Sequence, residues 1–242
     1  MVVPYLARIV GLRGIVYLDV YKTGFGRPYS GIDKATLKRV AGAVFTRHDS
    51  LSQSLVDAGI DGRHAGNLMM DTIPRTGLHV TRRKPLAVAV LPGSRAHALD
   101  NFAIQSAAID LIADKPDVLV PVARGVSLPE HKDMTLVSGA SLGDILDQVD
   151  VVLSQAGTAT VQAIGLGKPV ITFRNAHDRA SRFAAEQRLF DEARQVVPAD
   201  PAAIAEKLRA LLEDPSERAR LGVIGRARVG QPGALPAIIA AI

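Results

Sequence analysis

Two short loops of this chain carry residue types that bind phosphate. The tetrapeptide PGSR at 92–95 follows the apolar run LAVAVL and offers a glycine for close backbone approach, a serine hydroxyl and the forked guanidinium of Arg95. About sixty residues later, Gly157 and Thr158 follow the apolar run VVLS, and Thr160 adds a second hydroxyl. Each loop leads into a predicted helix, whose first-turn N–H groups and positive dipole end attract anions.

Each loop also has a structural explanation. PGSR is a plausible plain turn before a helix, and the small residues Ala156, Gly157 and Ala159 would let a helix pack close to a sheet. The two loops are expected on neighbouring strand ends of one domain. Together they favour a diphosphate site more than either loop does by itself. Neither loop matches the P-loop or the G-x-G-x-x-G pattern, which disfavours ATP hydrolysis and nicotinamide binding.

From residue 86 onwards, apolar runs alternate with helical patterns. We predict strands at 86–91, 117–123, 134–137, 151–154, 169–173 and 195–199. We predict helices at 97–115, 142–149, 158–167, 182–193 and 201–214. The first helix should present an apolar face made of Leu99, Phe102, Ala103, Ala107 and Leu111, and Asp200 should cap the last. Strands that are apolar throughout imply a parallel sheet covered on both faces, so residues 86–225 are expected to form a complete doubly wound α/β domain.

The front of the chain has the same pattern in part. GIVYLDV and GAVFTR predict strands, and GRHAGN predicts the end of another strand. SLSQSLVDAG predicts a helix that begins at Asp49 or Ser50. We therefore expect a partial N-terminal α/β domain over residues 1–67 and an inter-domain connection over 68–85. The final residues, 226–242, are expected to form a broken helix that packs back on the front part.

Composition indicates a globular chain of 242 residues, with 48% hydrophobic and 22% charged residues. No apolar run is long enough to span a membrane, and the N-terminus lacks the pattern of a secretory signal. The absence of cysteine excludes a disulfide framework and thiolate metal sites, and it agrees with a cytoplasmic protein.

Charge is unevenly distributed along the chain. Residues 1–85 hold 13 Lys and Arg against 6 Asp and Glu, whereas the remainder has a net charge of −2. A basic front half would favour an anionic membrane surface, although ordinary surface arginine explains the count equally well. Aromatic residues make up only 4% of the chain, and no basic stretch alternates with stacking residues, so nucleic acid is not an expected partner.

Other catalytic patterns are absent from the sequence. There is no G-x-S-x-G elbow and no H-E-x-x-H motif, and the six histidines lack ligand spacing, so we expect no metal site. Asp144 and Asp147 share one predicted helix, where a solvated face is the favoured interpretation. The catalytic residues are left unassigned.

A family resemblance emerges from these motifs together. VLPGSR followed by SQAGTATVQAIGLGKPVITF resembles the lipid-A-disaccharide synthase family, and is closest to its related branch. VFTRHDSLSQSLVDAGIDGRHAGNLMMD resembles the segment of that family that leads into the inter-domain region, and RFAAEQRLF resembles a later helix. The matches extend from residue 44 to about residue 190.

The resemblance implies a GT-B glycosyltransferase, in which two Rossmann-like domains hold a nucleotide sugar in a cleft. It implies that the donor and its diphosphate are bound by Gly93, Ser94, Arg95, Ser154, Gly157, Thr158, Thr160 and Gln162. Gln162 stands where the synthases have a glutamate that binds the ribose, so its contact should be weaker. Asn67 would face the cleft and Gln187 would lie near the sugar. The UDP-sugar is a substrate and no cofactor is implied, since Arg95 and the helix dipoles would stabilise the leaving group.

Two departures from the family pattern bear on activity: Gln162, and roughly one hundred N-terminal residues of the family that have no counterpart here. Those residues carry much of the acceptor site and the expected carboxylate base. We expect a UDP-GlcNAc-type donor and a lipid-linked acceptor, as in lipid A biosynthesis, with a peripheral location at the inner face of the membrane.

Two alternatives stay open. One is a UDP-GlcNAc 2-epimerase-like enzyme, for which His177 and Asp178 are the available polar residues. The other is a truncated nucleotide-sugar-binding module without turnover, which would pair with another chain, for example as a homodimer.

Overall fold

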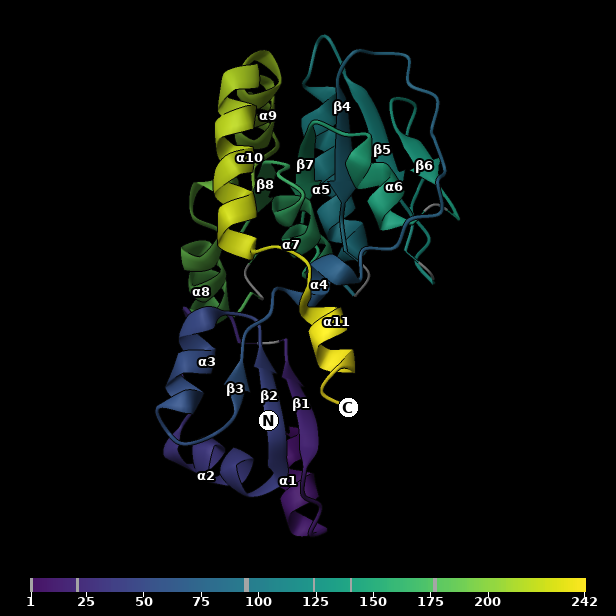
Figure 1. Ribbon diagram of the computed structural model, residues 1–242. Helices are drawn as coiled ribbons and strands as arrows, with labels where there is room; N and C mark the ends of the chain where they lie inside the picture. The colour runs from purple at the N-terminus through teal and green to yellow at the C-terminus, as the bar shows by residue number, and fades with distance from the viewer. Residues whose placement is uncertain (1, 21, 94–95, 124, 140, 176–177) are drawn as a thin grey trace. The chain divides into compact units, whose positions relative to one another are not determined.

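The computed structural model describes residues 2–20, 22–93, 96–123, 125–139, 141–175 and 178–242 (Figure 1). The chain forms two compact units. The first unit comprises Met1–Thr72, Ala180–Leu189 and Gly230–Ile242, and the second comprises Ile73–Arg179 and Phe190–Val229. The unit boundaries differ from the predicted ranges, because a helix from the C-terminal half of the sequence belongs to the first unit.

The second unit contains a six-stranded sheet in which every pair is parallel, in the order β6-β5-β4-β7-β8-β9. Its strands are β4 (Ala87–Leu91), β5 (Asp117–Pro121), β6 (Thr135–Val137), β7 (Val151–Ser154), β8 (Val170–Phe173) and β9 (Arg194–Val197). Every residue of β4, β7 and β8 is buried, as expected for strands that are covered on both faces. The predicted doubly wound domain is confirmed.

Helices cover both faces of this sheet. The second unit contains α5 (Ala98–Asp110), α6 (Leu142–Asp147), α7 (Thr158–Gly165), the short 3₁₀ turn η1 (Asp191–Ala193), α9 (Pro201–Glu213) and α10 (Pro215–Val229). From β4 the chain winds towards β6, and from β7 it winds the opposite way towards β9. Right-handed crossovers in opposite directions place α5 and α7 on opposite faces, and α9 contacts α5 whereas α10 contacts α7.

The first unit has a three-stranded parallel sheet in the order β1-β2-β3. Its elements are α1 (Val2–Ile9), β1 (Ile15–Asp19), α2 (Gly31–Val40), β2 (Ala41–Thr46), α3 (Asp49–Val56), β3 (Gly62–Arg63), α4 (Leu68–Asp71), α8 (Ala180–Phe190, of which Phe190 belongs to the second unit) and α11 (Ala234–Ile239). Because side chains alternate along β2, Val44 joins one apolar cluster with Leu37 and Leu55, while Ala43 and Phe45 join a second cluster on the other face.

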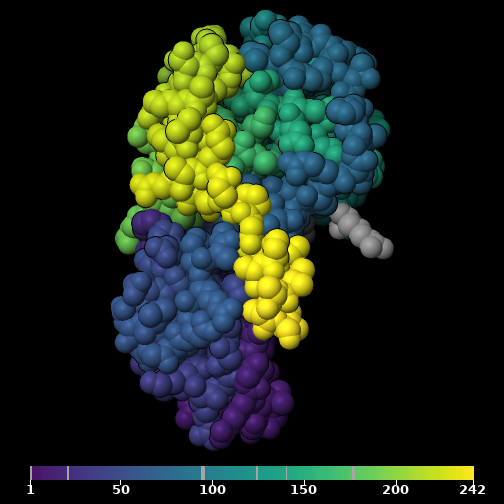
Figure 2. Space-filling model, in the orientation of Figure 1, coloured from purple at the N-terminus to yellow at the C-terminus, as the bar shows by residue number. Residues whose placement is uncertain are grey.

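The C-terminal helix α11 packs on the first unit. Ala234 and Ile238 contact the β2 side chains Ala43 and Phe45, and Figure 2 shows the C-terminal residues (yellow) against the blue and purple N-terminal ones. Asp71 of α4 anchors the start of α11, since its carboxylate accepts hydrogen bonds from the backbone N–H of Gly233 at 2.7 Å and from the next two amides. A carboxylate at a helix N-terminus satisfies amides that the helix itself leaves unpaired.

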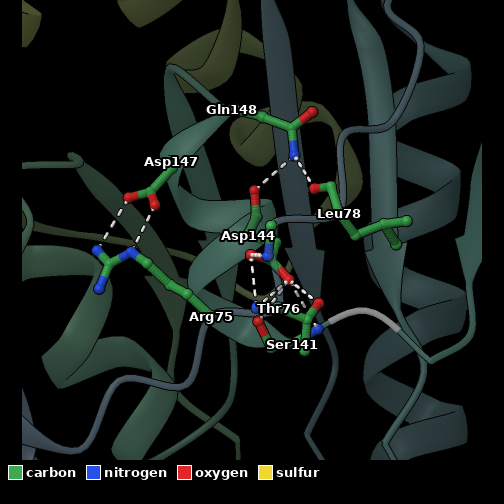
Figure 3. A network of polar contacts seen from close by, with 8 residues as sticks. Arg75, Thr76, Leu78, Ser141, Asp144, Asp147 and Gln148 are labelled. Carbon is green, nitrogen blue, oxygen red and sulfur yellow. Dashed lines mark hydrogen bonds and ion pairs between the residues drawn. The ribbon is translucent and has the colours of Figure 1, made fainter.

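Residues 73–80 lie along α6 rather than forming a free connection. Asp144, which is only 5% exposed, accepts hydrogen bonds from the Thr76 hydroxyl at 2.5 Å, from the Thr76 and Gly77 amides at 3.0 Å and from the Ser141 hydroxyl at 2.6 Å (Figure 3). Arg75 forms an exposed ion pair with Asp147 at 2.6 Å. The expectation that Asp144 belongs to a solvated face is therefore wrong, because its carboxylate organises a segment that lies far away in the sequence.

The predicted apolar face of α5 is also wrong in most positions. Phe102 is buried, but Leu99 and Leu111 are more than half exposed, while the polar side chains of Asn101 and Gln105 are buried. The helix therefore turns a partly polar face towards the sheet. None of the helices in the described part of the chain has the length and apolar character needed to cross a bilayer.

Candidate functional site

The two predicted phosphate loops leave the same edge of the second unit's sheet. β4 and β7 are adjacent parallel strands with Leu91 opposite Ser154, and the Gln155 amide donates to the Leu91 carbonyl at 2.8 Å. This confirms that the loops lie on neighbouring strand ends. The winding of the sheet reverses between these two strands, and open α/β sheets bind ligands beyond the carboxyl ends of their strands at such a reversal.

The loop after β4 begins with Gly93, whose φ of +101° lies in the region that favours glycine. A Cβ atom built on Gly93 would lie 3.6 Å from the Gln155 carbonyl oxygen, so this glycine approaches the loop after β7. Ser94 and Arg95, the other predicted members of this loop, lie outside the described residues, and their roles remain predictions.

In the loop after β7, two hydroxyls predicted to bind phosphate are bonded to the fold itself. The buried Ser154 and Thr160 hydroxyl oxygens lie 2.7 Å apart. Thr160 also donates to the Ala156 carbonyl, and the Ala156 amide donates to the Ser154 hydroxyl at 3.2 Å. These bonds fix the turn between β7 and α7, so the hydroxyls of Ser154 and Thr160 position the loop in this structure.

The start of α7 presents backbone and an exposed hydroxyl. Its N-cap residue is Gly157, which forms no side-chain cap bond, and Thr158 is the first helical residue and is exposed. A helix that starts without a capping side chain leaves its first amides available to an external anion. Gly157 and Thr158 are exposed at this helix start, and their phosphate-binding role stays a prediction.

Gln155 is a candidate site residue that sequence reasoning did not assign. Among the described residues, its buried Nε2 atom has no hydrogen-bond partner, although the residue lies between the β7 strand end and the N-cap of α7. A buried amide N–H without an acceptor costs free energy, so its position at a binding edge points to an acceptor supplied by a ligand. The sequence did offer one signal for Gln155: it stands in SQAGT, directly before the two small residues of the predicted phosphate loop.

A second set of polar residues ties two loops to the helix α5. The Asn101 amide of α5 donates to the Pro92 carbonyl at 2.9 Å, and its oxygen accepts a hydrogen bond from Asn175 at 3.0 Å. The Asn175 backbone N–H in turn donates to Asp178 at 2.8 Å. The loops after β4 and β8 are thereby fixed to α5. Sequence reasoning did not assign Asn101, although a polar residue within the apolar pattern of this helix was a signal for it.

The remaining predicted residues are distributed over both units. Gln162 is buried in α7, one turn beyond Thr158. Asn67 caps α4 in the first unit by accepting a hydrogen bond from the Met69 amide at 3.1 Å, and Gln187 lies on α8, which also belongs to the first unit. The structure therefore groups Gly93, Gly157 and Thr158 in one unit, and Asn67 and Gln187 in the other.

One group in the described part of the chain has the composition of a metal site. Ligand atoms of Asp110, His131 and Asp133 lie within 4.8 Å of one another. However, Lys115 already forms an ion pair with Asp133 at 3.0 Å, and Nδ1 of His131 accepts a hydrogen bond from the Asp133 amide. The lysine ammonium supplies the positive charge in this cluster, so we assign no metal to it.

Comparison with known protein families and with curated proteins finds no match. Solved structures do match. A protein from Listeria monocytogenes assigned as a UDP-N-acetylglucosamine 2-epimerase has a TM-score of 0.59 and 12% identity, over 94% of this chain and 74% of its own. MnaA of S. aureus, solved with UDP, has a TM-score of 0.63 and 12% identity, over 98% of this chain and 68% of its own.

A third similar structure is the spinosyn rhamnosyltransferase SpnG, with a TM-score of 0.60 and 14% identity, over 98% of this chain and 69% of its own. None of the three is a lipid-A-disaccharide synthase, so that resemblance rests on sequence motifs. At these identities the likeness establishes the fold. The chain has the α/β fold with parallel sheets that GT-B glycosyltransferases share with the epimerase-type proteins.

Proposed function

We propose that this chain binds a UDP-sugar at the β4–β7 edge of its second unit and belongs to a glycosyl-transferring enzyme. The observation that carries the proposal is the pair of glycine-containing loops at the point where the sheet reverses its winding, together with the unpartnered Gln155 amide between them. Two proteins of similar fold, MnaA of S. aureus and HepE of Anabaena, were solved with UDP or UDP-glucose, which supports the choice of ligand.

The site would act by stabilising a nucleoside diphosphate leaving group. In the reaction, an acceptor hydroxyl attacks the anomeric carbon, the bond from that carbon to the diphosphate oxygen breaks, and the hydroxyl proton passes to a base that we do not assign. Negative charge develops on the leaving diphosphate oxygen. We propose that it is stabilised by hydrogen bonds from the first amides of α7, the Thr158 hydroxyl and the Arg95 guanidinium.

The motifs described above support a more specific proposal for the donor and the acceptor. We propose a UDP-GlcNAc-type donor with Gln162 near the ribose, and a lipid-linked acceptor as in lipid-A-disaccharide synthases. Peripheral attachment to an anionic membrane and a homodimer are parts of the same proposal. They can be tested by vesicle sedimentation and by light scattering.

Isothermal titration with UDP and UDP-GlcNAc tests the donor site. We expect binding that Arg95→Ala weakens by about 1–3 kcal/mol, the value of a charged hydrogen bond, and that Gln155→Leu weakens by about 1 kcal/mol. Arg209→Ala, on the exposed face of α9, is the matched control and should bind as the wild type does. No binding at millimolar UDP would refute the proposal.

An epimerase is the second candidate, favoured by the structural likeness to the Listeria protein and by Asp178 within the loop after β8. NMR of UDP-GlcNAc incubated with the protein distinguishes the candidates, since only an epimerase converts the sugar to the manno configuration without an acceptor, as UDP-ManNAc or, if water then cleaves the bond to the diphosphate, as ManNAc and UDP. UDP binding without any turnover, in the presence of lipid-linked acceptors, would favour the nucleotide-sugar-binding module.

A further inference from the structure

One face of the helix α1 is apolar and exposed, and we call it the α1 stripe. Its side chains recur at the spacing that lines one side of a helix, and the Val10 amide continues the helical turn by donating to the Leu6 carbonyl at 3.0 Å. The exposed fractions are 73% for Val2, 62% for Val3, 55% for Leu6, 79% for Ile9 and 68% for Val10. A stripe of this kind ordinarily packs on a core, whereas no described residue covers this one.

The other side of α1 is fixed to α2 (Figure 1). The Tyr5 hydroxyl donates to the Asp33 carboxylate at 2.9 Å, and the Arg8 guanidinium donates to the Thr36 hydroxyl at 3.2 Å. Two residues of α1 are buried, namely Pro4 and Ala7. The α1 stripe is therefore held on an ordered support and faces away from it.

The α1 stripe differs from the other exposed apolar residues of the protein. In the second unit such residues are scattered, and single exposed apolar side chains are usual on a protein surface. They are Leu78, Leu99, Leu111, Val196 and Val223. The α1 stripe instead gathers its side chains on one side of one helix, and a contiguous apolar patch of this kind marks a surface that contacts another molecule.

The surroundings of the α1 stripe are basic. Arg8 and Arg13 are exposed, and residues 2–18 contain no Asp or Glu. The helix α2, on which α1 is fixed, adds the exposed Lys38 and Arg39 and has a single acidic residue. A partner that covers the stripe therefore meets apolar side chains next to a positive charge.

A lipid surface matches both properties. Acyl chains take up apolar side chains, anionic headgroups attract Lys and Arg, and the long arginine side chain can keep its charge among the headgroups. A second copy of this chain would instead bring the same cations together, which is unfavourable. The charge therefore favours an anionic bilayer over self-association as the partner of this face.

We propose that α1 lies in the surface of an anionic bilayer, with the α1 stripe among the acyl chains and Arg13, which follows the stripe in the sequence, beside the lipid phosphates. Amphipathic helices bind bilayers in this way, in the plane of the interface. The proposal rests on the peripheral attachment that is part of the proposed function, and it assigns that attachment to one helix. It does not depend on UDP-sugar binding by the second unit.

Vesicle sedimentation tests the proposal on the whole chain. The vesicles consist of phosphatidylcholine alone or of equal parts of phosphatidylcholine and phosphatidylglycerol. We expect at least about tenfold tighter binding to the anionic vesicles, and weaker binding at high salt, because the basic residues are attracted to anionic headgroups. Equal binding to both kinds of vesicle, or binding to neither, would overturn the proposal.

The double variant Leu6→Gln/Ile9→Gln tests the α1 stripe itself. Both side chains are exposed and glutamine is a good helix former, so we expect an unchanged melting temperature and an affinity for anionic vesicles that is at least about tenfold lower. Val56→Gln/Val223→Gln is the matched control, because it removes two apolar side chains that are 51% and 61% exposed on other helices. Unchanged vesicle binding by Leu6→Gln/Ile9→Gln would overturn the proposal.

Two further measurements separate this proposal from its alternatives. If the stripe joins two copies of the chain, light scattering without lipid would show a dimer that Leu6→Gln/Ile9→Gln converts to a monomer, and that result with unchanged vesicle binding would refute a lipid partner. Titration with UDP should give the same affinity for the wild type and for both double variants. A wild-type protein that binds vesicles but not UDP would refute the donor site and leave the role of α1 standing.

A fluorescent reporter locates the contact directly. The chain contains no tryptophan, so a single introduced tryptophan reports only on its own surroundings. The emission of Ile9→Trp should shift to shorter wavelength when anionic vesicles are added, because the ring leaves water for the bilayer interface, whereas the emission of Val223→Trp should not shift. An unshifted Ile9→Trp emission at a vesicle concentration that sediments the protein would place the contact elsewhere and overturn the proposal.

Discussion

Asp144 shows how much one buried carboxylate can organise. It accepts hydrogen bonds from five donors, which are the amide and hydroxyl of Ser141, the amide and hydroxyl of Thr76 and the amide of Gly77, and it thereby holds residues 73–80 on α6 (Figure 3). Close packing supports the same contact, since a Cβ on Gly143 would lie 2.4 Å from the Pro74 carbonyl oxygen. The hydrogen bonds lower the pKa of Asp144 well below the ordinary value of an aspartate, because each of them favours the ionised form.

The lowered pKa predicts a dependence of stability on pH. A carboxyl group whose pKa is lower in the folded state stabilises the protein above its unfolded pKa, near 4, and this contribution is lost as the pH falls below that value. Asp144→Asn should therefore lower the free energy of unfolding at pH 7, and the difference from the wild type should shrink towards pH 2.

Urea unfolding at pH 7, 4 and 2 measures this effect. Asp147→Asn is the control, because it removes only the exposed ion pair with Arg75, and such pairs contribute little to stability. Equal stability of Asp144→Asn and the wild type at pH 7 would contradict the prediction.

At the scale of elements, α10 is held against the rest of the second unit by glycines. A Cβ on Gly222 would lie 2.5 Å from the Gly167 carbonyl oxygen, and one on Gly225 would lie 2.6 Å from the Ile164 carbonyl oxygen. The helix backbone therefore touches the end of α7 directly. Any side chain at these positions has to displace one of the two elements.

Gly225→Ala should destabilise the protein by about 1–3 kcal/mol, as overpacking of a well-packed core does. Alanine ordinarily stabilises a helix relative to glycine, so the sign of the effect is diagnostic. Gly31→Ala, at the start of α2 with no atom within 4 Å of the added Cβ, is the control and should leave stability unchanged or slightly higher. Chemical denaturation measures both, and a stabilised Gly225→Ala would refute the close contact.

At the scale of the whole molecule, the two units have separate cores of different size. The core of the second unit extends over four strands of a six-stranded sheet and includes α5 and α9. The first unit divides a smaller set of apolar side chains between the two faces of a three-stranded sheet. Local stability follows the amount of buried apolar contact, so the first unit should open more readily.

Hydrogen exchange followed by mass spectrometry tests this difference. Amides of β7 should exchange more slowly than those of β2, although both strands are central in their sheets. Saturating UDP should slow exchange in the loops after β4 and β7 and leave β2 unchanged. Equal protection of β2 and β7 in the free protein would indicate a single cooperative unit.

Most elements of the second unit were predictable because buried strands of a parallel sheet are apolar throughout. The helices α1, α2 and α10 were not predicted from the sequence. Of these, α10 and α1 lack the continuous buried apolar stripe by which a helix is predicted. The buried face of α10 consists of Leu221, Gly222, Gly225 and Val229, so it has no continuous apolar stripe, and α1 exposes its large apolar residues. The helix α2 did have a signal, the Ser30–Asp33 capping box that the structure contains.

The sequence by itself determined the alternating α/β pattern, the glycine-containing loops at two strand ends and the cap of α9 by Asp200, because each depends on residues close together in the chain. Only the tertiary structure decided the strand order with its reversal between β4 and β7. It also decided that the Ser154 and Thr160 hydroxyls bond to each other, that the Asp144 carboxylate is buried and hydrogen-bonded, and that the Gln155 amide has no partner among the described residues. The physical reason is that local patterns report which face of an element is apolar. Whether a polar side chain is bonded within the fold or left for a ligand depends on partners from distant parts of the chain.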